Sequence, residues 1–240
     1  MEPTLLALDT ATETMALALI VPGGVQTRLM PGGAAASAQL IPAVLSLLAD
    51  ADVEMRQLDA IAFGQGPGAF TGLRTACAVA QGLAFGIDRP VLAIDSLLLV
   101  ADDAQAQQPL ADDAALLHWV AMDARMDEVY AAAYGRRAAV WQRQVAPALY
   151  TLPALAERWR LQPPVRVAGS AISAFGARLP FGSAQAFARE HDRAAALARL
   201  AREAWSQRAQ LDPAQALPLY LRDKVALTTA ERAAQKAAAA

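Results

Sequence analysis

One stretch, from Ala60 to Gly86, constrains the fold of this chain more than any other. It joins a short apolar run, Ala60 to Phe63, to a glycine-rich loop and then to an alanine-rich amphipathic segment. Glycine reaches backbone angles that are strained for other residues, so the loop at 64–68 ends the strand sharply. Thr71 is placed to cap the helix that follows, since its hydroxyl can accept a hydrogen bond from a free amide in the first turn. The stretch therefore predicts a strand, a tight loop and a helix in succession.

The helical segment after the loop has one apolar face. Apolar and small residues recur at steps of three and four, which places them on the same side of a helix. These residues are Leu73, Ala76, Cys77, Ala80, Leu83 and Ala84.

The glycine loop allows two interpretations. Free amides at a helix N-terminus beside glycines form a ready site for a phosphate or a carboxylate, and Gly66, Gly68 and Thr71 would belong to it. Alternatively, the loop is a tight turn that packs the helix on a sheet. The loop lacks the Gly-Lys-Ser/Thr ending of a P-loop, and its glycines do not follow the GxGxxG spacing of dinucleotide sites.

Composition indicates an ordered globular protein. The 240 residues are 55% hydrophobic and 18% charged, which is typical of a chain with a sizeable core. The net charge is −2, and the longest basic cluster is Arg136-Arg137. Because strong RNA binding by one protein needs a concentrated basic surface, we expect little direct RNA binding.

Reactive and metal-binding side chains are scarce. Cys77 is the single cysteine and lies on the apolar helix face, so it excludes an internal disulfide and is expected to be buried and unreactive. His118 and His191 lie far apart without HxxxH or HExxH spacing, so we expect no histidine-based metal site. The two lysines, Lys224 and Lys236, leave no lysine nucleophile in the body of the chain. We see neither a signal peptide nor an apolar run of the roughly 18 residues that a membrane span needs, and expect a cytoplasmic protein.

The first half of the chain alternates strands and helices. Leu5–Leu8 and Met15–Val21 indicate a hairpin with a polar corner, and Val25–Met30 a third strand. Ala35–Asp50 is apolar on two sides, which is typical of a helix that is buried or meets a partner. After the glycine-loop unit, Val91–Ile94 indicates a parallel strand, so the predicted order is βββαβαβ.

The second half repeats the order of three strands and a helix, which suggests a duplicated domain. A helix at 96–108 ends in the soft stretch Gln-Ala-Gln-Gln-Pro, where we place the domain boundary. The predicted division is an N-terminal lobe at 1–108, a C-terminal lobe at 109–227, and a frayed or disordered tail at 228–240. Within the second lobe we expect strands at 115–122, 128–134, 139–145 and 165–168 and helices at 152–160 and 191–209.

Three side chains are candidates for chemistry. Asp9 follows the first strand and Asp123 holds the equivalent place in the second half, so the two carboxylates could face one cleft and share a magnesium ion or acid-base work. The alternative for Asp9 is to accept backbone amides in the hairpin corner. Arg74 lies about one turn into the helix after the glycine loop, where it could bind an anion or a partner's carboxylate, or form an ordinary surface ion pair. Ser37 and Thr71 have no histidine in sequence context, so we do not expect a serine hydrolase.

Four segments together resemble one known family. They are LLALDTATETMALAL, DAIAFGQGPGAFTGLRTACAVAQGLAFG, AMDARMDEVYAA and PLYLRDKVA, in this order along both halves. The GPGxFTGLR loop and the DARMxEVY strand are the most specific parts. On these motifs the chain resembles the TsaB family, also called YeaZ, of bacterial proteins in tRNA threonylcarbamoyladenosine (t6A) biosynthesis.

The resemblance implies a fold and a role. The fold is α/β and two-lobed, of the actin, hexokinase and Hsp70 class (ASKHA) in its M22 or Kae1-like branch, and each lobe is a mixed sheet with flanking helices. The role is a non-catalytic assembly subunit that pairs with its paralogue TsaD, is joined by the ATPase TsaE, and forms a homodimer when alone. The complex attaches threonylcarbamoyl to N6 of adenosine 37 in tRNA, which it contacts mainly as a complex.

The same resemblance places the chemistry in the partners. ATP and a metal are expected in the partner subunits, and no catalytic residue, cofactor or metal is expected in this chain. The rival hypothesis is an ASKHA-fold ATPase or phosphotransferase that uses the inter-lobe cleft, with Asp9 and Asp123 around magnesium.

The pairing surface is expected on the helices of the N-terminal lobe. Small residues on one helix would let a partner helix approach closely, and apolar residues on the other would supply contact area. At least half of these side chains are also expected to serve the chain's own core, since each helix has a sheet to cover. The predicted contact residues are Leu40, Val44, Leu47, Leu48, Gly72, Arg74, Ala76 and Ala80.

Overall fold

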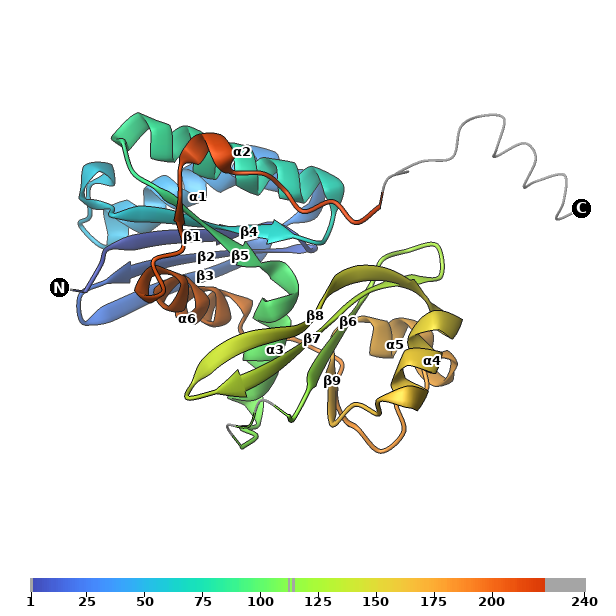
Figure 1. The fold of residues 1–240 in the computed structure, drawn as a ribbon. Coiled ribbons are helices and arrows are strands. Elements are labelled where there is room, and N and C mark those ends of the chain that lie inside the picture. Colours follow the sequence, from blue (N-terminus) through green and yellow to red (C-terminus); the bar gives the residue numbers. More distant parts are fainter. Residues whose placement is uncertain (1, 112, 114, 223–240) are drawn as a thin grey trace, which may run out of the picture.

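Two mixed β-sheets divide the protein into two halves, and the helix Ser96–Gln107 lies between them (Figure 1). The computed structural model describes residues 2–111, 113 and 115–222. The tail predicted at 228–240 lies outside the described residues, as does the end of the PLYLRDKVA motif.

The first sheet has six strands in the order β11-β5-β4-β1-β2-β3. Strand β1 pairs antiparallel with β2, and the strand at Val91–Asp95 pairs parallel with β4, so the predicted hairpin and the predicted parallel strand are confirmed. The order βββαβαβ is confirmed as well. The strands are β1 (Leu5–Asp9), β2 (Thr14–Val21), β3 (Gly24–Pro31), β4 (Ala60–Gly66), β5 (Val91–Asp95) and β11 (Gln210–Leu211).

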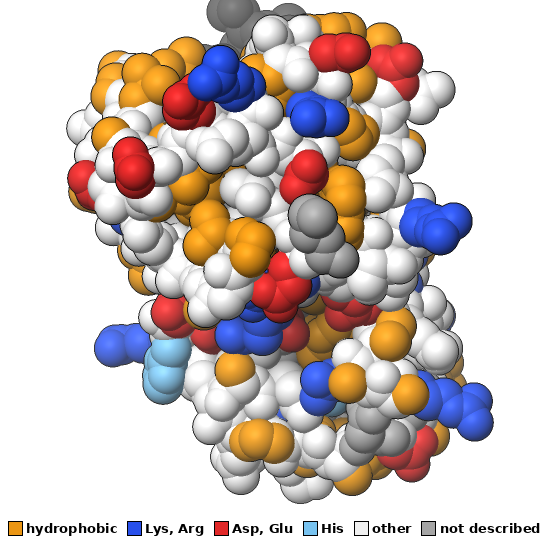
Figure 2. All heavy atoms as spheres, turned by 90° about the vertical axis from the view of Figure 1, so that its left-hand side faces the viewer, with side chains coloured by type: hydrophobic (Ala, Val, Ile, Leu, Met, Phe, Trp, Pro, Cys, Tyr) orange, Lys and Arg blue, Asp and Glu red, His pale blue; other side chains and the backbone are white. Residues whose placement is uncertain are grey.

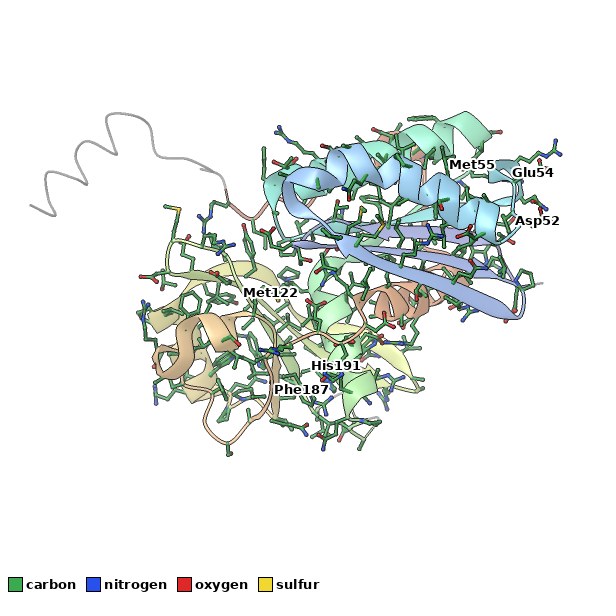
Figure 3. The ribbon with its side chains drawn as sticks, turned by 180° about the vertical axis from the view of Figure 1, so that it is seen from behind. Asp52, Glu54, Met55, Met122, Phe187 and His191 are labelled. Atoms are coloured by element: carbon green, nitrogen blue, oxygen red, sulfur yellow. The ribbon has the colours of Figure 1, made fainter. Side chains whose placement is uncertain are left out.

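Helices cover both faces of the first sheet. Side chains alternate along β1, so Leu6 and Leu8 pack under α1 (Ala36–Asp50) and α2 (Phe70–Ile87). Leu5 and Ala7 point to the other face, which is covered by α3 (Ser96–Gln107) and α6 (Arg193–Ser206). Figure 3 shows α1 and α2 side by side on their face of the sheet.

The second sheet repeats the topology of the first. Strand β6 pairs antiparallel with β7 and parallel with β9, as β1 does with β2 and β4. Helices α4 (Leu152–Leu161) and α5 (Ala171–Phe175) pack on one face, and α3 packs on the other. The strands are β6 (His118–Asp123), β7 (Glu128–Arg137), β8 (Val140–Thr151), β9 (Arg166–Ala168) and β10 (Gln185–Phe187), in the order β10-β9-β6-β7-β8. The two-sheet α/β architecture agrees with the expected fold class.

The chain returns to the first sheet after completing the second. Leu197 and Leu200 of α6 are buried in one cluster with β1 and β2, and β11 pairs antiparallel with β5. The boundary predicted at residue 108 falls just after α3, but residues 193–211 of the predicted second lobe pack on the first sheet. The division into lobes at 1–108 and 109–227 therefore stays a prediction.

Among the residues that the structure describes, one segment passes the test for a membrane span, contrary to the expectation that no apolar run is long enough. Gly33–Asp50 is long and apolar enough to cross a membrane by length and composition alone. In the structure Leu40, Val44 and Leu47 of this segment pack on the first sheet. Burial on the sheet thus accounts for one side of the segment, while Ile41 and Leu45 on its other side are exposed. A cytoplasmic location remains a prediction.

Buried polar contacts join the two halves. Tyr134 on β7 donates a hydrogen bond of 2.7 Å to Oδ2 of Asp95 at the start of α3. Trp141 on β8 donates from Nε1 to Asp102 of α3 over 3.0 Å, and Arg199 of α6 donates to the same carboxylate over 2.6 Å. Helix α3 is thereby fixed to both sheets.

Candidate functional site

A cleft of about 790 Å³ lies between the two halves. Met122, which Figure 3 labels at the carboxyl end of β6, lies on its wall from the second half. Charged groups of both signs line it, including Glu13, Asp123, Arg125 and Arg189. The walls comprise the β1–β2 corner at residues 11–14, the end of the glycine loop and the start of α2 at 67–70, the β6–β7 loop at 122–126, the residues just before α6, and residues 219–222.

Asp9 ends β1 and is completely buried beneath the wall of this cleft. Its Oδ1 accepts hydrogen bonds from the backbone amide of Ala11 at 3.1 Å and from Nε of Arg193 at 3.0 Å. Its Oδ2 accepts from Oγ of Ser96 at 2.8 Å. The bond from the amide of Ala11 is the alternative role given above for Asp9, in which it accepts backbone amides in the hairpin corner. The other two donors, Ser96 and Arg193, come from elements far along the sequence.

Arg193 is the cation that neutralises Asp9. It is the first residue of α6, whose N-terminus is capped by the side chain of Asp192. Its remaining nitrogens reach Glu190 at 2.6 Å and the carbonyl of Ser96 at 3.2 Å. Burial alone would lower the pKa of this guanidinium, but the charges of Asp9 and Glu190 outweigh burial and raise the pKa above its usual range. A permanent cation therefore lies against Oδ1 of the buried Asp9 carboxylate.

Asp123 ends β6 and lies at the surface of the cleft. Its backbone amide donates to Oγ of Ser170 at 3.0 Å, and its Oδ1 accepts from the amide of Arg125 at 2.8 Å. The side chain is 21% exposed, whereas that of Asp9 is fully covered. The two aspartates thus end equivalent strands, as predicted, but differ in access: Asp123 faces the cleft and Asp9 is enclosed by protein.

The glycine loop is docked on the β1–β2 corner. The amide of Ala69 donates to the carbonyl of Ala11 at 2.8 Å, and a Cβ on Gly68 would lie 2.5 Å from that carbonyl oxygen. Gly66 has a φ of +113°, and its amide donates to Oγ of Ser96 at 3.1 Å. These contacts explain the glycines as places of close backbone approach. The structural interpretation of the loop has this support, and the anion-site interpretation stays a prediction.

The predicted cap at Thr71 is wrong. Helix α2 begins at Phe70, because the carbonyl of Ala69 already accepts the amide of Leu73 at 2.9 Å. Thr71 is therefore inside the first turn, and its side chain is exposed. Nearby, a Cβ on Gly72 would overlap the carbonyl oxygen of Thr10, so this glycine fixes how closely α2 meets the corner.

The predicted partner contacts on α1 and α2 are mostly core residues of this chain. Each helix turns its apolar face to the sheet, and seven of the eight predicted residues are buried there. A part for these residues in partner contact stays a prediction. The outer face instead presents Ile41 and Leu45 on α1 and Phe85 on α2, which are 46%, 54% and 57% exposed. The seven buried residues are Leu40, Val44, Leu47, Leu48, Gly72, Ala76 and Ala80.

Arg74 is exposed, as a contact residue should be, but it has partners within the chain. Its guanidinium lies 3.8 Å from the ring centroid of Phe70, and its Nε donates to Oη of Tyr220 at 3.0 Å. The alternative to a partner contact was an ion pair within the chain. Arg74 does have partners within the chain, but they are the aromatic side chains of Phe70 and Tyr220 and not a carboxylate.

Sequence reasoning missed Arg193, Ser96 and Arg222. Arg193 lies 184 residues from its partner, and only the Asp192 cap signal marks its position at the start of a helix. Arg222 belongs to the PLYLRDKVA motif, which the resemblance singled out without giving it a role. Among residues 2–111, 113 and 115–222, no three His, Cys, Asp or Glu side chains form a group suited to a metal ion.

The chain is similar to proteins of known family. A family model described as TsaD, tRNA N6-adenosine threonylcarbamoyltransferase, matches residues 23–158. The tRNA threonylcarbamoyladenosine biosynthesis protein TsaB of Haemophilus influenzae is 40% identical over 131 residues, which are 53% of this chain and 52% of that protein. TsaB of Escherichia coli is 35% identical over 132 residues, 55% of each chain. The chain thus matches about half the length of these curated relatives.

Solved structures extend the similarity to most of the chain. The structure of YeaZ from Pseudomonas aeruginosa is 36% identical with a TM-score of 0.80, and covers 91% of this chain and 100% of its own. A second Pseudomonas aeruginosa structure, described as an uncharacterized protein with similarity to peptidase YEAZ, is 36% identical with a TM-score of 0.81, over 92% of this chain and 100% of its own.

Proposed function

The chain belongs to the TsaB (YeaZ) family, and from this premise we propose that it is a non-catalytic assembly subunit in tRNA t6A biosynthesis. It pairs with a TsaD homologue, is joined by a TsaE homologue, and forms a homodimer when alone. The complex attaches threonylcarbamoyl to N6 of adenosine 37, with ATP and metal held by the partner subunits.

The buried Asp9–Arg193 ion pair carries the non-catalytic part of this proposal. A strand-end carboxylate that binds magnesium must present free oxygen atoms to the ion and its water ligands. Both oxygens of Asp9 are already occupied by protein donors, and the nearest charge is a guanidinium. The rival ATPase or phosphotransferase would therefore lack its first carboxylate and would have to work with Asp123 alone.

The outer face of α1 and α2 supports the pairing part of the proposal. Ile41, Leu45 and Phe85 are large apolar side chains about half exposed to solvent. Small exposed residues of α2, Ala78 and Gly82, would allow a partner helix to approach closely. Apolar side chains set among small ones suit a helix-to-helix contact, so we place the partner there.

The charge distribution fits RNA contact through the complex. Figure 2 shows acidic and basic side chains interspersed on one face and along the junction of the two halves. Mixed signs on this face give no concentrated field for a polyanion there, and the net charge of the chain is −2, so we assign the affinity for tRNA mainly to the partners.

Reconstitution tests this function directly. The full chain is added to TsaD and TsaE homologues, tRNA and activated threonylcarbamoyl substrate, and t6A is measured by mass spectrometry of the digested tRNA. We expect modification only when the chain is present, and no magnesium-dependent phosphate release from the pure chain. Phosphate release by the pure chain that disappears in Asp123→Asn would instead support the rival enzyme.

A further inference from the structure

The C-terminal strap, residues 210–222, runs from the first half of the protein to the second along the mouth of the cleft. It leaves the first sheet at β11 and passes over α2, where Figure 1 shows it in red. The amide of Leu219 donates to the carbonyl of Gln65 at 2.8 Å, and the side chain of Gln65 donates to the carbonyl of Leu217 at 3.1 Å. Residues 219–222 then form part of the cleft wall.

Tyr220 anchors the strap to the first half. Its ring lies 5.0 Å from that of Phe70 at the start of α2, measured between centroids. Arg74 lies over the Phe70 ring and donates to the Tyr220 hydroxyl. Two aromatic rings and one guanidinium thus hold this point of the strap to α2.

Arg222 anchors the strap to the second half. Its Nη2 donates to the carbonyl of Ala124 at 3.0 Å and to Oε2 of Glu128 at 2.5 Å, and its side chain is 14% exposed. Three consecutive loop residues between these acceptors, at 125–127, have φ values of 63°, 57° and 58°. Left-handed backbone is unfavourable for residues other than glycine, so the surrounding contacts must hold the β6–β7 loop in this shape.

The two anchors lie on opposite walls of the cleft and are separated by one residue, Leu221. An extended chain advances at most about 3.6 Å per residue, so the Cα atoms of Tyr220 and Arg222 cannot be more than about 7 Å apart. While both anchors hold, the walls cannot separate at this point. We propose that the strap is a latch: with Arg222 bound to the β6–β7 loop the cleft mouth stays at its present width, and release of Arg222 opens it to larger molecules.

Hydrogen–deuterium exchange of the full chain tests the latch, with Arg222→Met as the main variant. The matched control is Arg178→Met. Arg178, at the end of the short helix Gly176–Arg178, pairs with Asp127 of the same loop at 3.1 Å but from within the second half. A second variant, Tyr220→Ala, removes the other anchor and leaves Arg222 in place.

The latch predicts exchange that is about tenfold faster both at 124–128 and at 217–222 in Arg222→Met, with core strands unchanged. It predicts the same at 217–222 for Tyr220→Ala, and no change at 217–222 for Arg178→Met. Faster exchange confined to 124–128 in Arg222→Met would show a local loop contact and would overturn the latch.

Distances across the cleft give an independent readout. Spin labels at two exposed positions, Thr27→Cys on β3 and Ser173→Cys on α5, in a Cys77→Ala background, report the separation of the halves. We expect a longer and broader distance distribution in Arg222→Met than in the parent or in Arg178→Met. Identical distributions in all three proteins would likewise overturn the proposal.

Discussion

Nε of Arg193 lies 3.0 Å from Oδ1 of Asp9, and the two side chains are 4% and 0% exposed. The acid ends β1 and the base begins α6, so the contact joins two parts of the first half that lie 184 residues apart in the sequence. Replacing one member of a buried ion pair by a neutral residue lowers stability strongly, because the other charge stays buried without a partner and keeps its desolvation penalty.

Arg193→Met should therefore lower the free energy of unfolding by about 3–5 kcal/mol, since it leaves the carboxylate of Asp9 buried without its counter-ion. Urea denaturation followed by circular dichroism measures this change. The double variant Asp9→Asn, Arg193→Met should be less destabilised than the sum of the two single variants. Strict additivity would mean that the two side chains do not interact in solution.

Gly72→Ala should be strongly destabilising. The added Cβ would overlap the carbonyl oxygen of Thr10, so α2 would have to shift, at a cost of about 3 kcal/mol or more. Gly82, in the same helix, has open space where a Cβ would lie. Gly82→Ala should therefore stabilise the protein by up to about 1 kcal/mol through helix propensity. Equal thermal shifts for the two variants would show that α2 does not pack on the corner as described.

Stability should fall with acid in a way that depends on His118. Burial in β6, together with the charges of Arg166 and Arg136, lowers the pKa of His118 to about 4. In the unfolded chain the pKa is about 6.5, so between these values the unfolded state binds a proton that the folded state does not. The free energy of unfolding contributed by this group is thus complete above about pH 6.5 and is lost as the pH falls toward 4.

Denaturation at pH 7 and pH 5 checks that the free energy of unfolding falls as the pH is lowered. The parent should lose about 2 kcal/mol more than His118→Gln between the two conditions, because the variant lacks the titrating group. The same pH dependence in both proteins would contradict the lowered pKa.

Local patterns predicted the elements well for physical reasons. The apolar runs at 5–8 and 15–21, the alternation at 25–30 and the three- and four-residue steps in α2 report directly on backbone geometry. The glycines at 64–68 were less exact, since β4 continues through Gly64 to Gly66. The repeated βββα order also appears as the same strand pairing in both sheets.

Local sequence patterns did not predict which elements that are distant in the sequence contact each other. Nothing in the sequence of α6 indicates which sheet the helix covers. Arg193 contacts Asp9 only because tertiary folding brings α6 onto the first sheet. Helix α1 is apolar on two sides, so the sequence did not separate the core positions Val44 and Leu48 from the exposed Ile41 and Leu45. Which apolar face of α1 is buried depends on how the helix packs on the first sheet, and this is a tertiary contact that the local sequence does not encode.

Light scattering of the chain alone and mixed with a TsaD homologue tests the central claim most directly. Arg introduced at Val44 would enter the core, so the informative variant is Leu45→Arg on the outer face of α1. The matched control is Leu29→Arg on β3, a leucine of similar exposure, 46% against 54%, away from the α1 and α2 face.

An unpaired charge in a helix-pair interface costs several kcal/mol, so Leu45→Arg should stay folded and lose both the homodimer and the heterodimer. Leu29→Arg should keep both assemblies. A heterodimer that persists unchanged in Leu45→Arg would contradict the placement of the partner on α1 and α2, and a parent chain that never binds the TsaD homologue would contradict the assembly role itself.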